Sequence, residues 1–460
     1  MTAAVLADFG STFTKITLVE LGSGRLISTA QSPTTATSDV MLGFHAALRQ
    51  ATAGLETPVE IGPKRAASSA AGGLRVAAVG LIEDLTAAVA RQAALNAGAK
   101  VGLVLHGNLT TEDRQALRDY DPEVILFCGG TDGGQEQRVL ANATAIADAV
   151  DAHVIVACNT RIAEAVAAVL SAAGGHVEVV TNVMPRIGAV DIEPARAAIS
   201  EAFVRHVIRG KGLTEAPEFF RDVIMPTPEA VLQATRLLAE INGGVAILDI
   251  GGATTDVHTV TKNPGSGPGI EGPLVPVLPV LRSVQGDLGL RSNAISVLET
   301  DNEWLNERND PGTLREAAEM RSETPDFTAR TPSEWQVDEA LATSCAHHAL
   351  RRHCGTLLVT SSPGRPARIS ADGPDLRELP LLVGTGGILV RSPQAESVLS
   401  EAISRCESRS LVPRRPRIAI DRDYILAAAG LLADIDRDAA ARLARHALAG
   451  SENTRRPLQT

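Results

Sequence analysis

The sequence is poor in aromatic residues and has few cysteines. Phe, Trp and Tyr together make up 3% of the 460 residues, so the core must be built mainly from Ala, Val, Leu and Ile. The five cysteines are scattered without a C-x-x-C pair, and an odd number in a chain of this length is not typical of a disulfide framework. We therefore expect free thiols and a cytoplasmic protein.

Long apolar runs and an excess of positive charge are also missing. No stretch approaches about 18 uninterrupted apolar residues, and the first residues lack the basic region of a signal peptide, so we expect neither a membrane-spanning helix nor a secreted protein. Lys and Arg number 43 against 54 Asp and Glu, a net charge of −11. This balance argues against a general binder of nucleic acid or anionic membranes. Small molecules and proteins are the expected partners.

The same strand-turn-strand pattern occurs twice, far apart in the chain. Residues 5–15 and 245–256 each contain an apolar strand, an Asp-x-Gly turn rich in Gly, Ser and Thr, and the start of a second strand. In such a turn the backbone can approach a phosphate, and the Asp at the strand end can reach a hydrated Mg²⁺. One turn of this kind would indicate only a change of chain direction. Two of them predict a clamp that holds a polyphosphate from both sides.

A third glycine-rich segment, residues 381–390, is an apolar strand that ends in Gly-Thr-Gly-Gly. Glycines there would let a base and a ribose lie against the backbone, although a tight strand-to-helix turn explains the same pattern. Between the hairpins, four apolar runs alternate with helical patterns, which is typical of a parallel α/β sheet. The loop 129–134 follows one of these runs, and it is either an anion-binding loop or a sharp turn.

The order of these segments resembles the phosphate 1, phosphate 2 and adenosine motifs of the actin, Hsp70 and sugar-kinase ATPase superfamily. More narrowly, the chain resembles the MutL/GlmL family, accessory proteins of glutamate mutase and related adenosylcobalamin-dependent aminomutases. That likeness covers nearly the whole length, on the motifs around residues 8–15, 128–134, 182–185, 248–256, 285–289 and 384–387.

The resemblance implies a two-lobed α/β fold of the actin/Hsp70-like (ribonuclease H-like) type with an additional parallel α/β segment. We expect a first lobe over residues 1–95, the α/β elaboration over 96–215, the second lobe over 216–450 and a flexible tail over 451–460. Residues 226–240 stand where the superfamily has its first connecting helix, and residues 424–432 are a candidate for the second.

The implied ligand is ATP or ADP with Mg²⁺. Asp8 and Asp249 are expected to reach the metal, mostly through water. The residues expected to hold the nucleotide are Asp8, Gly10, Ser11, Thr12, Lys15, Gly251, Gly252, Ala253, Thr254, Thr255, Gly384, Thr385, Gly386 and Gly387. Hydrolysis needs a group that orients water, for which the candidates are Asp256, Gln285 and Asp287. Each has a simpler explanation, since Asp256 can cap its hairpin and Asp287 can belong to a turn.

The implied function is that of a slowly ATP-hydrolysing chaperone or reactivase for an adenosylcobalamin-dependent mutase. A small-molecule kinase of the same fold and a nucleotide-sensing scaffold without turnover remain as alternatives. Two further patterns carry little weight. His153 lacks the sequence context of a cobalt ligand, and the Cys345 to Cys354 segment with its three histidines is better explained as the basic end of a helix than as a zinc site.

Overall fold

The computed structural model describes residues 1–10, 13–35, 39–55, 59–69, 74–210, 223–262, 269–273, 276–361 and 367–453. Ser11 and Thr12 of the first predicted phosphate turn lie outside the described residues, and so do most of the predicted tail and part of the glycine- and proline-rich stretch after residue 262. Within the described residues, no helix has both the length and the apolar character needed to cross a membrane.

The first lobe is built on a five-stranded sheet in the order β10-β4-β1-β2-β3. β1, β2 and β3 form an antiparallel meander, while β4 and β10 run parallel to β1. α1 covers one face, where Phe44 packs near Phe9 in the core. The bounds are β1 Thr2–Phe9, β2 Phe13–Glu20, β3 Leu26–Pro33, α1 Val40–Thr52, β4 Glu60–Ser68 and β10 Val223–Pro226.

The sheet of the second lobe repeats this plan, in the order β13-β12-β11-β16-β17. Again the first three strands in sequence form an antiparallel meander, and the last two run parallel to the first. This duplicated strand order confirms the two-lobed, ribonuclease H-like fold predicted from the sequence. The bounds are β11 Gly244–Ile250, β12 Thr255–Thr261, β13 Val280–Gln285, β16 Leu381–Thr385 and β17 Arg417–Ile420.

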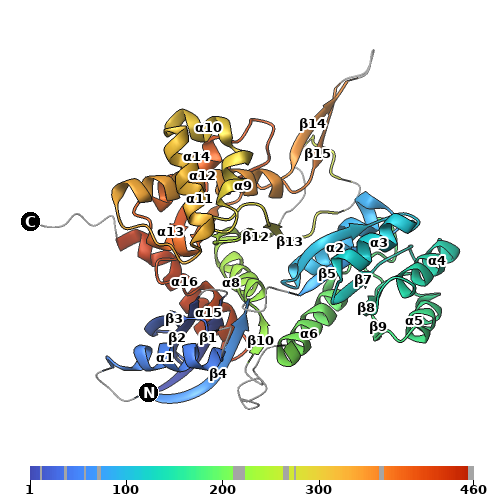
Figure 1. Cartoon of the computed structure of the whole chain (residues 1–460), viewed down its shortest axis with the longest axis horizontal. Coiled ribbons are helices and arrows are strands. Elements are labelled where there is room, and N and C mark those ends of the chain that lie inside the picture. Colours follow the sequence, from blue (N-terminus) through green and yellow to red (C-terminus); the bar gives the residue numbers. More distant parts are fainter. Residues whose placement is uncertain are drawn as a thin grey trace, which may run out of the picture.

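Helices α8 (Thr227–Asn242), α15 (Leu426–Leu432) and α16 (Arg437–Asn453) join the two sheets through one apolar cluster. Figure 1 shows α8 and α15 between the first lobe and the second. α15 approaches α8 so closely that a Cβ on Gly430 would lie 1.8 Å from the carbonyl oxygen of Ala230. Since only a glycine fits at this point, the contact between the helices is fixed by backbone packing.

Further helices cover the outer face of the second sheet, and a two-stranded hairpin extends from it (Figure 1). The polar stretch after residue 299 is helical, and the helix that contains Cys345 begins with a capping box on Thr331 and Glu334. The bounds are α9 Ala294–Thr300, α10 Asn302–Arg308, α11 Pro311–Glu323, α12 Pro332–His353, β14 Thr356–Thr360, β15 Arg368–Asp372, α13 Gly387–Arg391 and α14 Ala395–Ser404.

The segment between the hairpins is a separate parallel sheet in the order β6-β5-β7-β8-β9, with helices on both sides. In Figure 1 it lies to one side of the two lobes. The bounds are β5 Arg75–Val79, the π-helical turn η1 Glu83–Ala87, α2 Ala88–Asn96, β6 Lys100–Leu105, α3 Thr111–Tyr120, β7 Val124–Phe127, α4 Glu136–Ala147, β8 His153–Val156, α5 Ala163–Ala172, β9 Val177–Val179 and α6 Glu193–Gly210.

The strand pairing differs from the expected division of the chain at two segment boundaries. β5 is hydrogen-bonded between β6 and β7, so the parallel sheet begins before residue 96. β10 pairs with β4, so a strand after residue 216 belongs to the first lobe. Both strands are short, and their sheets are completed by segments distant in sequence, which a linear division of the chain does not detect.

Candidate functional site

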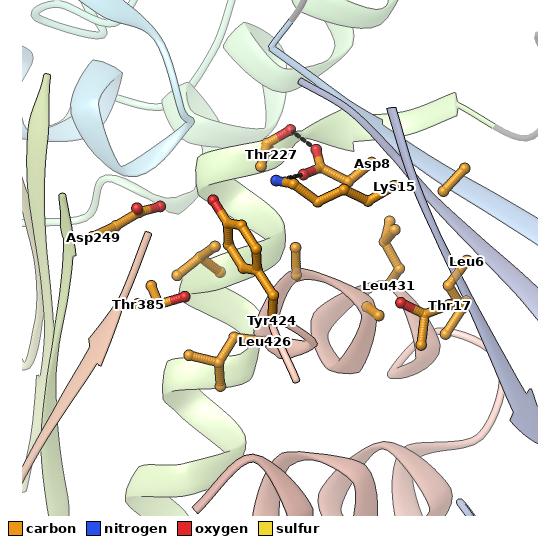
Figure 2. Close-up of a pocket in the computed structure, with 14 residues that line it drawn as sticks. Leu6, Asp8, Lys15, Thr17, Thr227, Asp249, Thr385, Tyr424, Leu426 and Leu431 are labelled. Atoms are coloured by element: carbon orange, nitrogen blue, oxygen red, sulfur yellow. Dashed lines mark hydrogen bonds and ion pairs between the residues drawn. The ribbon is translucent and has the colours of Figure 1, made fainter. Parts of the chain in front are cut away.

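The ends of β1 and β11 face one small cavity between the two lobes. Its volume is about 30 Å³, which is room for a water molecule. Figure 2 shows Asp8, Lys15 and Thr227 on one side, Asp249 and Thr385 on the other, and Tyr424 between them. The remaining lining residues are small or apolar, apart from Thr17: Leu6, Ala7, Val231, Leu426, Ala427, Ala428 and Leu431.

The first-lobe wall is organised around the carboxylate of Asp8. Asp8 and Lys15 stand opposite each other on β1 and β2, and Lys15 Nζ lies 3.0 Å from Asp8 Oδ2. The other carboxylate oxygen accepts a hydrogen bond of 2.6 Å from the hydroxyl of Thr227, the first residue of α8. One carboxylate thus ties the first hairpin to the connecting helix.

Tyr424 closes the cavity from the side of the second connecting helix. Its ring lies below Lys15, with Nζ 3.9 Å from the ring centroid, a cation–π contact. Tyr424 has a φ of +56°, a conformation that residues other than glycine seldom adopt. Burial alone would lower the pKa of Lys15, but the attraction of Asp8 and of Tyr424 outweighs it, so this pKa lies above its ordinary value. Lys15 is therefore a permanent cation at neutral pH.

The second-lobe wall contains Asp249, whose carboxyl group is hard to ionise. Burial, with repulsion from Asp256 and, more weakly, from Asp8 and Asp421, raises the pKa of Asp249 to about 7, although Lys15 acts in the opposite direction. Carboxylates gathered in this way repel one another, and a divalent cation would relieve the repulsion.

Asp421 lies next to the site, bonded to the lining residue Thr385, and the sequence reasoning missed it. It follows β17 directly, and it accepts hydrogen bonds from the N–H groups of Ile425 and Leu426 and from the hydroxyl of Thr385. Burial raises the pKa of Asp421 to about 6, against the effect of these donors. An apolar strand that ends in Asp is the same signal as at Asp8 and Asp249, so the sequence did contain the information.

The predicted adenosine motif divides into residues with different surroundings. Gly384 lies within β16, where an added Cβ would press on Leu389, Leu399 and Ile420, so its missing side chain serves packing. Gly386 has a φ of +92°, and an added Cβ would lie 2.3 Å from the oxygen of Ile250. Gly387, in contrast, has open space beside it. Only Gly387 therefore offers a face that a nucleoside can reach.

The second phosphate turn is held from behind by the 285–291 loop. The N–H groups of Leu290 and Arg291 donate to the carbonyls of Gly251 and Gly252, at 3.2 and 2.7 Å. Gly252 and Ala253 are exposed and Thr254 is partly so, whereas the hydroxyl of Thr255 is buried and donates to the carbonyl of Leu288. Gly252 and Ala253 are therefore open to a ligand, whereas the hydroxyl of Thr255 stabilises the turn from behind.

The three candidates for orienting water lie outside the cavity lining. Arg352 holds both Gln285 and Asp287, with Nη1 3.2 Å from Gln285 Oε1 and 2.7 Å from Asp287 Oδ1, and this hydrogen bond lowers the pKa of Asp287. Asp256 Oδ2 accepts a 2.7 Å hydrogen bond from Arg282. Asp256 Oδ1 is shielded from solvent and has no hydrogen-bond partner among the described residues. Of the three, Asp256 alone has a buried oxygen without a hydrogen-bond partner among the described residues.

The donor set fits the group that the resemblance implies. Hard carboxylate oxygens suit Mg²⁺, which is held in proteins by few carboxylates together with water and phosphate oxygens. Asp8 and Asp249 would supply such oxygens from the two lobes, and Lys15 and the 251–254 turn would supply donors for phosphate. A nucleotide is far larger than the cavity, so binding it requires the lobes or the side chains of Lys15 and Tyr424 to move.

Two other candidate sites have structural explanations. In the loop 129–134, the N–H groups of Asp132, Gly133 and Gly134 are all bonded within the protein, and the side chain of Asn182 bonds back to the loop. The histidines around residue 350 belong to no group of three metal-ligating side chains within the described ranges. His353 instead bonds to Thr259 and Ser283.

Comparison with known proteins identifies the family of the chain. The model of the MutL protein family matches residues 4–448. The chain belongs to the MutL family. It is 36% identical to Protein MutL of Clostridium tetanomorphum, over 96% of this chain and 98% of that protein.

Two solved structures show distant likeness. A glycerol dehydratase reactivase aligns at 11% identity with a TM-score of 0.36, over 94% of this chain and 99% of that one. Component A of (R)-2-hydroxyglutaryl-CoA dehydratase from Acidaminococcus fermentans aligns at 10% identity with a TM-score of 0.32, over 97% and 99%. The fold of this MutL-family chain is assigned by its duplicated strand order, and these likenesses add nothing about its chemistry.

Proposed function

We propose that this MutL-family protein binds Mg-ATP between its lobes, hydrolyses it slowly and uses the cycle to change the angle between the lobes. One observation carries the proposal. Asp8, paired with Lys15, stands at the end of a strand in the first sheet, and Asp249 stands at the equivalent strand end in the second sheet. All three residues line the same cavity. A polyphosphate with its metal is the ligand that would relieve the repulsion between these carboxylates and use the lysine.

Hydrolysis needs a water molecule as the acceptor of the phosphoryl group. Asp256 is the residue that we propose for orienting it, because its Oδ1 is buried and without a partner among the described residues. The link from Asp256 through Arg282 to the middle segment would let a change at this position reach another part of the molecule.

The experiment that tests nucleotide binding is calorimetric titration of Mg-ATP. Asp249→Asn keeps the size of the side chain and removes its charge, so we expect affinity to fall at least about tenfold, a loss of about 1.4 kcal/mol. Asp148→Asn, which removes an exposed carboxylate after α4, is the matched control and should bind as the native protein does. Equal affinity in the Asp249 variant would contradict the metal assignment.

We further propose that the partner is an adenosylcobalamin-dependent mutase, such as glutamate mutase, and that the protein acts on it as a chaperone or reactivase. Family membership supports an accessory role, and the physical need is clear, because exchange of a damaged cofactor requires a closed active site to open. An ATPase with two lobe angles biases that opening if its ATP and ADP states bind the open and closed mutase with different affinity.

Recovery of a mutase inactivated by turnover tests this role. The native protein with Mg-ATP and fresh cofactor should restore activity and release damaged cobalamin, and the Asp8→Ala variant should not. Equal recovery without ATP would overturn the proposal. ADP release that rises by orders of magnitude with a sugar or acid acceptor would identify a kinase instead, and the absence of turnover would identify a sensing scaffold.

A further inference from the structure

A second cavity, of about 430 Å³, lies among α6, α8, the end of β12 and the start of α16. Its volume is within the range of small-molecule sites. It shares no lining residue with the cavity between the lobes. The lining residues are Glu193, Arg196, Gln233, Arg236, Ala239, Glu240, Val260, Thr261, Lys262 and Arg437.

The two cavities lie on opposite faces of α8. Thr227 and Val231 contribute to the first, and Gln233, Arg236 and Glu240 to the second. At about 100° per residue, these two sets point roughly half a turn apart around the helix axis. One connecting helix therefore separates the proposed nucleotide site from the second cavity.

Positive charge exceeds negative charge around the second cavity. Four of its lining residues are Arg or Lys and two are Glu, in a chain whose net charge is −11. Two of the four cations are already neutralised. Arg196 pairs with Glu193 at 2.8 Å and with the buried Glu229, and Arg437 pairs with Glu240.

The other two cations, Arg236 and Lys262, are poorly matched. Arg236 pairs with Glu193 at 3.5 Å, which it shares with Arg196, and it is also attracted by the buried Glu229. The Nε of Arg236 is shielded from solvent and has no hydrogen-bond partner in the described part of the chain. Lys262, exposed just after β12, has no ion-pair partner in the same part of the chain. The cavity thus holds one cation, Lys262, without a counter-charge among the described residues, and one guanidinium group, that of Arg236, with an unused donor.

We propose that this cavity binds a small molecule that carries a phosphate group, with Arg236 and Lys262 as its anchors. A guanidinium group presents paired donors that match two phosphate oxygens, and an ammonium group adds a point charge beside them. The bound anion joins the connecting helix α8, through Arg236, to the second lobe, through Lys262. It therefore acts as an effector that holds these two parts in one arrangement.

Titration of pyrophosphate in the presence of a metal chelator tests the site. The native chain should bind it, and Arg236→Gln/Lys262→Gln should bind it at least about tenfold more weakly, a difference of about 1.4 kcal/mol. The matched control, Arg330→Gln/Lys100→Gln, removes the same charge from exposed positions and should bind as the native chain does. Lys262→Gln alone should also weaken binding. Because Lys262 is exposed, this single variant should fold normally, so it tests the site even if the double variant misfolds.

Lys15→Met separates this inference from the nucleotide site. Pyrophosphate affinity should survive Lys15→Met, since Lys15 lines only the first cavity. If affinity is lost in Lys15→Met and kept in Arg236→Gln/Lys262→Gln, the proposal is overturned. It is also overturned if the native chain does not bind pyrophosphate at millimolar concentration, or if succinate binds as tightly as pyrophosphate.

Discussion

Lys15 and Asp8 stand directly opposite each other on the first hairpin, and their side chains meet at 3.0 Å beside a second carboxylate, Asp249, in the same cavity. We predict that Lys15→Met weakens Mg-ATP binding at least about tenfold. We also expect it to lower the free energy of unfolding at neutral pH by about 1–3 kcal/mol, because Asp8 would keep its charge and lose its cation. Calorimetry and urea denaturation measure the two effects.

Lys100→Met is the control for this prediction, because Lys100 is an exposed lysine at the start of β6. It should change neither the affinity nor the midpoint of unfolding. Native-like binding in Lys15→Met would mean that the lysine serves only the Asp8 ion pair.

Stability should depend on pH through Asp249. Its pKa is about 7 in the folded protein, against an ordinary value of 3.8, so between these values the folded state holds a proton that the unfolded state has lost. Stability therefore falls as pH rises through this window and stays lower above it. We predict that Asp249→Asn is more stable than the native protein at about pH 8, and that the difference disappears as the pH approaches 4.

Chemical denaturation at about pH 5, 6.5 and 8, without nucleotide or divalent cation, measures the difference in the free energy of unfolding between Asp249→Asn and the native protein. Asp148→Asn, which changes an exposed carboxyl group, should give a curve parallel to that of the native protein. A gap between Asp249→Asn and the native protein that stays constant over the range would show that Asp249 does not titrate there.

The neighbouring glycines 386 and 387 separate a packing role from a binding role. Alanine at 386 would have a positive φ and meet the carbonyl oxygen of Ile250 at 2.3 Å, so Gly386→Ala should lower the thermal midpoint. Gly387→Val adds a side chain where the structure leaves space, so the fold should tolerate it. If the nucleoside lies against Gly387, this variant loses ATP affinity while keeping its thermal stability. Unchanged affinity in Gly387→Val would move the nucleoside elsewhere.

Local signals in the sequence predicted most of the fold. Each hairpin combines an apolar strand, an Asp-x-Gly turn and a second strand, and both form as expected. The four predicted strands of the middle sheet and the helices after them are also confirmed. These elements depend on patterns of about ten residues, which a single sequence contains.

Features that depend on contacts between distant segments were missed. β5 becomes the second strand of a sheet only because β6 and β7 flank it, and Thr227 reaches Asp8 across 219 positions of sequence. From the sequence, Tyr424 was predicted only as the first residue of a connecting helix. In the structure Tyr424 has a positive φ, and its ring lies beneath Lys15. Gln285 and Asp287 are both bonded to Arg352, a pairing that cannot be seen in the sequence.

Arg282 connects the second phosphate hairpin to the middle segment. Its Nη2 donates to Asp256 at 2.7 Å, and its Nη1 donates to the carbonyl of Leu95, near the end of α2, at 2.8 Å. The side chains of Arg282 and Asp256 are only 4% and 12% exposed. Arg282→Met would leave Asp256 buried without its cation, and we predict that it lowers the free energy of unfolding by about 3–5 kcal/mol.

A double-mutant cycle tests whether that loss comes from the ion pair. In Arg282→Met, the unpaired charge of Asp256 is repelled by Asp249. Asp256→Asn removes that charge, so Arg282→Met/Asp256→Asn should be more stable than Arg282→Met alone. Equilibrium unfolding in urea of the native protein and the three variants gives the coupling energy. If the two single effects simply add, the pair does not act as a unit, and the connection from the hairpin to α2 rests on the packing of Arg282 instead. A large coupling would show that the charge on Asp256 is what keeps Arg282 bonded to α2, so that a change in this charge reaches the middle segment.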